Sequence, residues 1–302
     1  MQLRYCRIPG GNFGDDVNAR LWPALFPDLA DHHPDAWLYG VGTILGGARP
    51  DGTKVVLGSG MGYRGDAGFD ATWHVYWVRG PRTAAASGLD PAVGLGDGAV
   101  LWEGLRRAAA PVPGRVGFVP HHKSYEGADW DAIAHRAGLF AIDPRQSPEA
   151  VTAALASCER VLTESLHGAI FADALGVPWR AVVLARRFHA FKWQDWLETL
   201  GMTLDVAEVP VELQARLAPV KALANRLARW TGYGGAEARN HLRPLRAATE
   251  ADIARVVDAL RGFAGDEARF VCSDAARREA QREAMRAQCA RFARDFGFTF
   301  AG

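Results

Sequence analysis

Cysteine is scarce in this chain, with four residues among 302, and the four lie far apart. They show no CxxC spacing, so the sequence indicates neither a disulfide framework nor a cysteine-based metal site. Long apolar runs are also missing: no window approaches the roughly 20 residues of a membrane span, and the N-terminal stretch has no apolar signal core. We therefore predict a protein of the reduced cytoplasm that can still dock at a membrane surface.

An excess of charge of either sign is absent as well. The chain has 35 basic and 34 acidic side chains and a net charge of +1, whereas a nucleic-acid-binding domain is usually clearly basic. We therefore predict no nucleic-acid partner. The composition does provide apolar material: 49% hydrophobic residues in a chain of 302 can bury a sizeable core, most often divided between two domains.

Strand-like runs alternate with helix-like runs along the first two thirds of the chain. Such alternation predicts parallel, doubly wound α/β units. The stretch "RRAAAPVPG" at 106–114 is typical of a linker. We thus predict two Rossmann-like domains, at 1–110 and 111–210, followed at 211–302 by a basic amphipathic segment and closing helices.

The segment 163–179, "TESLHGAIFADALGVPW", places a histidine between a predicted strand and a predicted helix. Gly176 stands where that helix ends, so Ser165, His167 and Gly168 fall in its first turn. Free N–H groups and the positive end of the helix dipole gather there, which suits an anion. A histidine at a helix start can also be a simple cap, but the anion-ready turn favours a functional role.

Polar side chains follow most of the other predicted strands. Ligands of parallel α/β sheets bind beyond the carboxyl ends of the strands. We therefore predict one cleft between the domains. We expect it to be lined by Asn12, Asp15, Gly42, Thr43, Ser59, Gly60, Arg79, Arg82, Asp97, His167 and one of the tandem histidines His121 and His122, with Lys123. Simpler interpretations stay open, because "GGNFGDD" and Asp97 are also typical of turns and the arginines can be solvated. No nucleotide cofactor is indicated, since the dinucleotide fingerprint and a P-loop lysine are missing.

Six motifs occur in a fixed order along about residues 4–196: "NFGDDVN", "GVGTILGG", "GSGMGY", "WVRGPRTA", "LGDGA" and "ESLHGAIFADALGVPW". Each is weak alone, but in this order they resemble the polysaccharide pyruvyl transferases. The nearest branch is that of the exopolysaccharide ketal pyruvyltransferases of the succinoglycan type.

The resemblance implies a fold, a donor and an acceptor. It implies two Rossmann-like domains arranged as in GT-B glycosyltransferases, phosphoenolpyruvate as donor, and a sugar acceptor, usually on a lipid-linked oligosaccharide at the cytoplasmic membrane face. It also implies that Arg79 and His167 carry donor binding and catalysis. Many members have arginine where this chain has Ser165. A second cation for the donor phosphate then has to come from Arg82, Lys123 or Lys192.

The residue types fit this reaction. A pyruvate ketal forms when the enol CH₂ is protonated, two sugar hydroxyls add to one carbon and phosphate leaves; this requires cations, a general acid and bases. We expect His167 to act as acid or phosphate partner. Hydroxyl protons would go to Asp15, Asp16 or Glu164, and further substrate contacts would come from Asn12, Ser165, Gly168 and His121. No step requires a metal or a cofactor.

Two other functions stay open. A GT-B glycosyltransferase would share the fold and the cleft, but it would use a nucleotide sugar and release a nucleoside diphosphate. A non-catalytic carbohydrate-binding protein would need aromatic platforms, which the ten tryptophans can supply, but it would not need Arg79 and His167 at strand ends.

The segment 213–246 has seven Lys or Arg residues and one acidic residue, Glu237. Beside an apolar stripe that ends at Trp230, these charges resemble an interfacial helix that meets anionic lipid. A core-packed helix with a solvated basic face is the competing interpretation.

Overall fold

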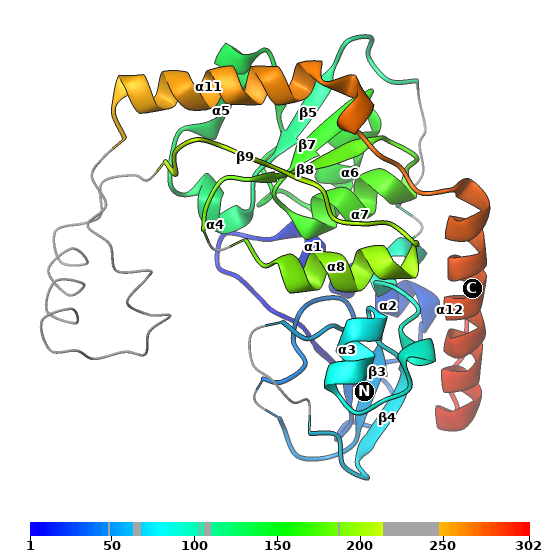
Figure 1. Cartoon of the computed structure of the whole chain (residues 1–302). Helices are drawn as coiled ribbons and strands as arrows, with labels where there is room; N and C mark the ends of the chain where they lie inside the picture. The colour runs from blue at the N-terminus through cyan, green and yellow to red at the C-terminus, as the bar shows by residue number, and fades with distance from the viewer. Residues whose placement is uncertain (48, 63–67, 103, 106–109, 187, 214–247) are drawn as a thin grey trace, which may run out of the picture.

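The computed structural model describes residues 1–47, 49–62, 68–102, 104–105, 110–186, 188–213 and 248–302. Within them the backbone forms two parallel β-sheets, one from each half of the chain (Figure 1). The first sheet holds its strands in chain order: β1 (Gln2–Arg4), β2 (Trp37–Tyr39), β3 (Lys54–Leu57) and β4 (Trp73–Trp77). The second has the order β6 (Phe140–Ala141), β5 (Val116–Val119), β7 (Arg160–Thr163), β8 (Trp179–Val183) and β9 (Val206–Glu208).

Helices connect the strands and follow the second sheet. The first unit contains α1 (Phe13–Asp16), α2 (Asn18–Leu25), α3 (Pro81–Ala86) and the 3₁₀ helices η1 (Pro91–Val93) and η2 (Gly98–Leu101). The second contains α4 (His122–Tyr125), α5 (Trp130–Ala137), α6 (Pro148–Ala156), α7 (Leu166–Ala174) and α8 (Ala190–Thr199). The C-terminal part contains α11 (Glu250–Gly265), η3 (Glu267–Arg269) and α12 (Ala275–Phe296). The predicted class of two Rossmann-like α/β units is confirmed.

Local signals in the sequence explain several helix ends. Ser147 caps α6, because its hydroxyl accepts the N–H of Ala150, and Pro148 occupies the first helical position. After α7, Gly176 has a φ of 69°, a left-handed conformation that glycine adopts without steric cost. The chain can therefore turn at once into β8.

The order of the second sheet reverses at β5. The chain passes from β5 to β6 on one side, and then returns to place β7 on the other side of β5. The loops that leave the carboxyl ends of β5 and β7 consequently diverge, and such a switch point is where ligands bind in open α/β sheets. His121 follows β5, and Glu164 follows β7.

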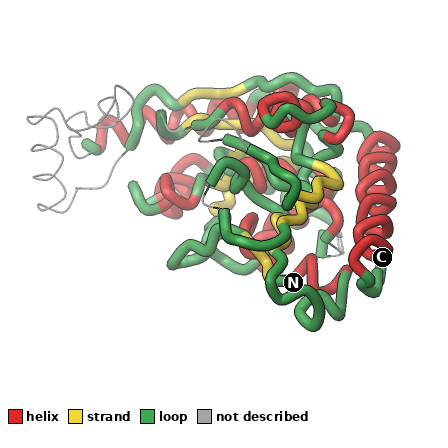
Figure 2. The backbone as a smooth tube through the Cα atoms, turned by 90° about the horizontal axis from the view of Figure 1, so that it is seen from below, coloured by secondary structure: helices red, strands yellow, loops and turns green. Residues whose placement is uncertain are grey.

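The two units are packed together, and α12 crosses from the second to the first. One buried core cluster includes Trp22 and Trp77 of the first unit and Phe171 of the second. On α12, the carboxylate of Asp295 accepts a hydrogen bond of 2.8 Å from the hydroxyl of Tyr76 on β4. The helix lies along one side of the molecule in both views (Figures 1 and 2). A terminal helix that returns to the first unit is what a GT-B-like arrangement predicts.

Two sequence predictions concern residues outside this description. Residues 106–109, at the predicted boundary near residue 110, are not among the described ones, so the domain limits stay a prediction. The basic segment 213–246 also lies outside them, apart from Leu213. Of the helices that the structure describes, none combines the length and apolar character that crossing a membrane requires.

Candidate active site

A cavity of about 150 Å³ opens at the carboxyl ends of β1, β5 and β7. Both units contribute to its wall, which is formed by Cys6, Ile8, Asn12, Asp15, Thr43, His121, His122, Lys123, Ser165, Leu166, His167 and Lys192. The predicted cleft between the domains therefore exists, and it gathers nine residues named from the sequence, Thr43 among them. Both tandem histidines line it, so the expectation that only one of them would do so is wrong.

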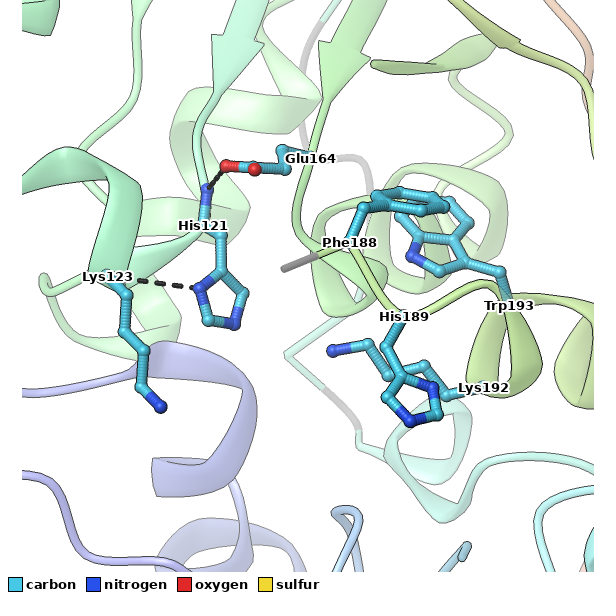
Figure 3. A pocket seen from close by; sticks show the side chains of 7 residues that line it. All are labelled: His121, Lys123, Glu164, Phe188, His189, Lys192 and Trp193. Carbon is cyan, nitrogen blue, oxygen red and sulfur yellow. Dashed lines mark hydrogen bonds between the residues drawn. The ribbon is translucent and has the colours of Figure 1, made fainter. Parts of the chain in front are cut away.

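A smaller hollow of about 70 Å³ adjoins this cavity and shares His121, Lys123 and Lys192 with it. Figure 3 shows His121 and Lys123 on one side of the hollow, opposite a group from the start of α8 that consists of Phe188, His189, Lys192 and Trp193. Glu164 also lines the hollow, and its Oε2 accepts the backbone N–H of His121 at 2.9 Å. Glu164 thus joins the ends of β7 and β5 at the switch point.

Asp15 is the carboxyl group best suited to proton transfer. It lies on α1, is 8% exposed, and accepts a hydrogen bond from the side-chain amide of Asn12. Burial raises its pKa from 3.8 to about 6, against the opposing influence of His167, Asn12 and Lys192. A carboxyl group with such a pKa can give or take a proton near neutral pH.

Lys192 enters the same cavity from α8. Burial lowers its pKa from 10.5 to about 8, and the charge of Arg79 acts in the same direction, whereas Asp15 and Glu164 raise it. Asp15 and Lys192 therefore face the cavity with pKa values on either side of neutral pH, as perturbed groups at functional sites often do.

The first turn of α7 forms the part of the cavity wall that suits an anion. Ser165 is its N-cap, and its hydroxyl accepts the N–H of Gly168 at 3.4 Å. Thr163 fixes this turn, because its hydroxyl donates to the carbonyl of Ser165 and accepts the N–H of the same residue. Ser165, His167 and Gly168 thus occupy the predicted turn, with Ser165 and His167 lining the cavity.

Close packing fixes the ring of His167. Its side chain is 13% exposed, and Phe13 and Phe171 contact it edge-on, with ring centroids 6.5 and 6.4 Å away. Gly14 of α1 lies against it, and a Cβ atom at that position would be 2.0 Å from Nδ1. Glycine is therefore required at position 14 if His167 is to keep this place.

Arg79 lies one layer behind the cavity. It is 1% exposed, and its N–H groups donate to Asp195 Oδ2 at 3.1 Å, Thr43 Oγ1 at 2.8 Å and the Met61 carbonyl at 2.9 Å. Of these partners, Thr43 lines the cavity. The guanidinium is thus directed to protein acceptors. Its predicted contact with the donor stays a prediction. Its positive charge lowers the pKa of Lys192, and in this way it influences the cavity.

Two other residues named from the sequence lie outside this wall. Arg82 donates to Glu198 and Gln194 of α8, and its side chain is 41% exposed. Asp16 accepts the backbone N–H of Asn12 at 2.9 Å and so stabilises the start of α1. Of the three cations considered for the donor phosphate, the two lysines line the cavity.

Sequence reasoning named Lys192 on the α8 side of the site but missed the residues around it. Phe188, His189 and Trp193 follow the carboxyl end of β8, so the strand-end rule that selected His121 could have found them. Cys6 and Ile8 follow β1 in the same way. Among the described residues, His, Cys, Asp and Glu side chains form no group of three that could hold a metal ion. That no metal or cofactor is needed stays a prediction.

Two comparisons with known proteins match this chain, and one of them covers a segment that builds part of the site. A family model described as polysaccharide pyruvyl transferase matches residues 113–184, which run from β5 to β8 and include His121, Glu164 and His167. The succinoglycan biosynthesis protein ExoV of Rhizobium meliloti (strain 1021) is 40% identical over 225 residues, or 71% of this chain and 70% of that protein. The chain belongs to the polysaccharide pyruvyl transferase family.

The resemblance of the six motifs is thereby confirmed, and so is the nearness to the succinoglycan branch. This pyruvyl transferase is an enzyme, so the non-catalytic carbohydrate-binding alternative is wrong. No solved structure matches the transferase at a significant level.

Proposed function

We propose that this transferase moves the pyruvyl group of phosphoenolpyruvate onto a sugar of a lipid-linked oligosaccharide and forms a pyruvate ketal during exopolysaccharide biosynthesis. Family membership and the name of the ExoV relative support a polysaccharide substrate. The observation that carries the proposal is the cavity itself. It combines a helix N-terminus, two lysines and a carboxyl group with a pKa of about 6.

The donor carries a phosphate and a carboxylate, and the cavity offers positive charge for both. Lys123 and Lys192 line it, and the first turn of α7 directs its N–H groups and its dipole toward it. Ser165 cannot supply the charge of the arginine that many family members have there. The two lysines replace that charge, since Arg82 is bound to Glu198 outside the cavity.

The reaction balances without a further reactant. One sugar hydroxyl bonds to the enol carbon of the donor while the CH₂ group takes up a proton and becomes CH₃. A second hydroxyl bonds to the same carbon, and the bond to the phosphate oxygen breaks. The two hydroxyls release two protons. In the overall balance, one of them corresponds to the proton that converts CH₂ to CH₃, and the other leaves on hydrogen phosphate.

Asp15 and His167 divide the proton transfers. Asp15, mostly ionised at neutral pH with a pKa of about 6, accepts the proton of an attacking hydroxyl. His167 at the start of α7 donates toward the phosphate side. Lys192 and Lys123 hold the donor anion, and His121 and Asn12 line the remaining wall. Glu164 accepts the backbone N–H of His121 and lines the adjoining hollow. From there it is the candidate base for the second hydroxyl.

Phosphorus NMR tests the donor. With phosphoenolpyruvate and a panel of synthetic lipid-linked glycosides, the donor signal should disappear as inorganic phosphate appears, only when an acceptor is present. The glycosyltransferase alternative gives the opposite pattern: a nucleotide sugar is consumed, a nucleoside diphosphate is released and phosphoenolpyruvate stays intact. That pattern would replace the proposal.

A lipid-linked acceptor also predicts peripheral contact with the membrane. The seven basic residues of 213–246 are the candidates from sequence. Flotation with liposomes should show binding to anionic but not neutral vesicles, weaker as salt rises, and lost in Arg226→Glu with Arg229→Glu. The variant should keep its activity on a soluble acceptor. Absence of flotation of the unmodified protein at low salt would contradict a membrane role.

A further inference from the structure

Asp97 and His167 come from different units and meet behind the cavity. Asp97 directly precedes η2, and its side chain has no exposed surface. Its Oδ1 accepts the N–H of Ala99 at 3.0 Å and so caps η2. The second oxygen, Oδ2, lies 3.7 Å from Nε2 of His167. Over the described residues, neither of these two atoms has a hydrogen-bond partner.

Capping alone does not account for an aspartate here. A serine or asparagine would cap η2 equally well and would bury no carboxylate, which is costly when one oxygen lacks a partner. The loop that holds Asp97 is also firmly placed. Trp77 Nε1 donates to the carbonyl of Gly96 at 3.1 Å, and Gly98 packs on the ring of Trp22. The carboxylate is thus held in a fixed direction, toward the imidazole.

The two ring nitrogens of His167 face different surroundings. Nε2 is buried and directed to Asp97. Nδ1 lies on the side of α1, close to Gly14, whose neighbour Asp15 lines the cavity and interacts electrostatically with His167. The ring therefore presents Nε2 to the interior carboxylate, and Nδ1 lies on the α1 side, where Asp15 lines the cavity.

We propose that Asp97 is a positioning residue for His167, which keeps the proton on Nε2 and leaves Nδ1 to exchange its proton with the substrate. The proposal rests on the proposed function, because it gives His167 a proton-transfer role. In the imidazolium form both nitrogens carry protons. Once Nδ1 has given its proton to the departing phosphate, the proton on Nε2 remains, held by the Asp97 carboxylate. The distance of 3.7 Å is longer than a hydrogen bond, as catalytic contacts often are before substrate binds.

Asp97→Asn is the informative variant, because it preserves the size of the side chain and the cap on η2. When the amide oxygen accepts the N–H of Ala99, the NH₂ group points at Nε2 of His167. Nε2 then has to accept, so the ring keeps its single proton on Nδ1. The imidazolium, which alone can give up the Nδ1 proton at neutral pH, is disfavoured. We expect kcat to fall by about 10²- to 10⁴-fold, while KM for phosphoenolpyruvate and Tm stay close to those of the unmodified enzyme.

Asp90→Asn is the matched control. Asp90 caps η1 in the same way, through a hydrogen bond of 2.9 Å from Ala92, but it is exposed. Its replacement should leave kcat unchanged. Should Asp97→Asn fail to fold, Asp97→Ser keeps a capping oxygen and removes the partner of His167, and the same loss of kcat at unchanged KM is expected.

Nitrogen NMR of the histidine rings gives a readout that needs no substrate. Comparison with His167→Gln assigns the His167 signals. We expect a protonated Nε2 in the unmodified chain and a protonated Nδ1 in Asp97→Asn. Identical His167 signals in the two proteins, or an unchanged kcat, would overturn the positioning role. If no acceptor leads to consumption of phosphoenolpyruvate by the unmodified enzyme, the proposed function fails instead, and the NMR comparison still decides the role of Asp97.

Discussion

Arg79 and Asp195 form an ion pair between the two α/β units, with 3.1 Å from Nε to Oδ2 and side-chain exposures of 1% and 0%. Asp195 also accepts the backbone N–H and the hydroxyl of Thr83. It belongs to α8, the helix that carries Lys192 into the cavity. The pair therefore connects the end of β4 to the helix whose Lys192 lines the cavity.

This pair predicts a large loss of stability in Arg79→Met. Removing one partner leaves the buried Asp195 carboxylate without its counter-charge, which typically costs about 3–5 kcal/mol. Unfolding in urea measures the change. The control is Arg82→Met, which breaks an exposed pair with Glu198 and should cost less than about 1 kcal/mol. A stable Arg79→Met that no longer binds phosphoenolpyruvate in calorimetry would instead support direct donor binding.

The pH profile of the reaction should be bell-shaped. Asp15 has to be ionised to accept a proton, so kcat/KM should rise with pH through its pKa of about 6. Lys192 has to be charged to hold the donor, so kcat/KM should fall again through its pKa of about 8. Initial rates across this range give both limbs.

Lys192→Arg tests the assignment of the alkaline limb. Arginine stays charged throughout this range, so that limb should disappear while the acid limb remains. An unchanged profile in this variant would assign the alkaline limb to another group.

The raised pKa of Asp15 also has a consequence for stability. The folded chain binds this proton more tightly than the unfolded chain, whose pKa is near 3.8. The resulting stabilisation is complete below about pH 4 and is lost as pH rises through about 6. Asp15→Asn stays neutral, so it should be more stable than the unmodified chain above pH 6, by about 1–3 kcal/mol, and nearly equal to it at pH 4.

Unfolding free energies measured at several pH values check this sign. Asp28 is the contrasting control: the backbone N–H of Thr299 lowers its pKa, so Asp28→Asn should lose stability at neutral pH. An Asp15→Asn variant that is less stable than the unmodified chain at neutral pH would contradict the cost assigned to the ionised carboxyl group.

The sequence predicted best what depends on local pattern. The turn of His167 follows from Gly176, Ser165 and the alternation of strand and helix. Asp15 and His121 follow from the rule that strand ends carry ligands. Residues whose surroundings come from distant segments were not predictable in this way. Arg79 was predicted as a ligand at a strand end, which stays a prediction. Its ion pair with Asp195 was not predicted, because Asp195 lies 116 positions away and no local pattern reveals that contact. The same holds for Asp97, whose cap was foreseeable and whose second oxygen meets a residue of the other unit.

His167 provides the last prediction. His167→Gln keeps a polar side chain of similar length but cannot transfer a proton at neutral pH, so kcat should fall by about 10²- to 10⁴-fold. Tm should change little, because Ser165 rather than His167 caps α7. If the ring served only to pack between Phe13 and Phe171, the pattern would be reversed: stability would fall by about 1 kcal/mol and turnover per folded molecule would persist. Turnover and Tm measured on one preparation separate these outcomes, and His135→Gln, an exposed histidine of α5, controls for the substitution itself.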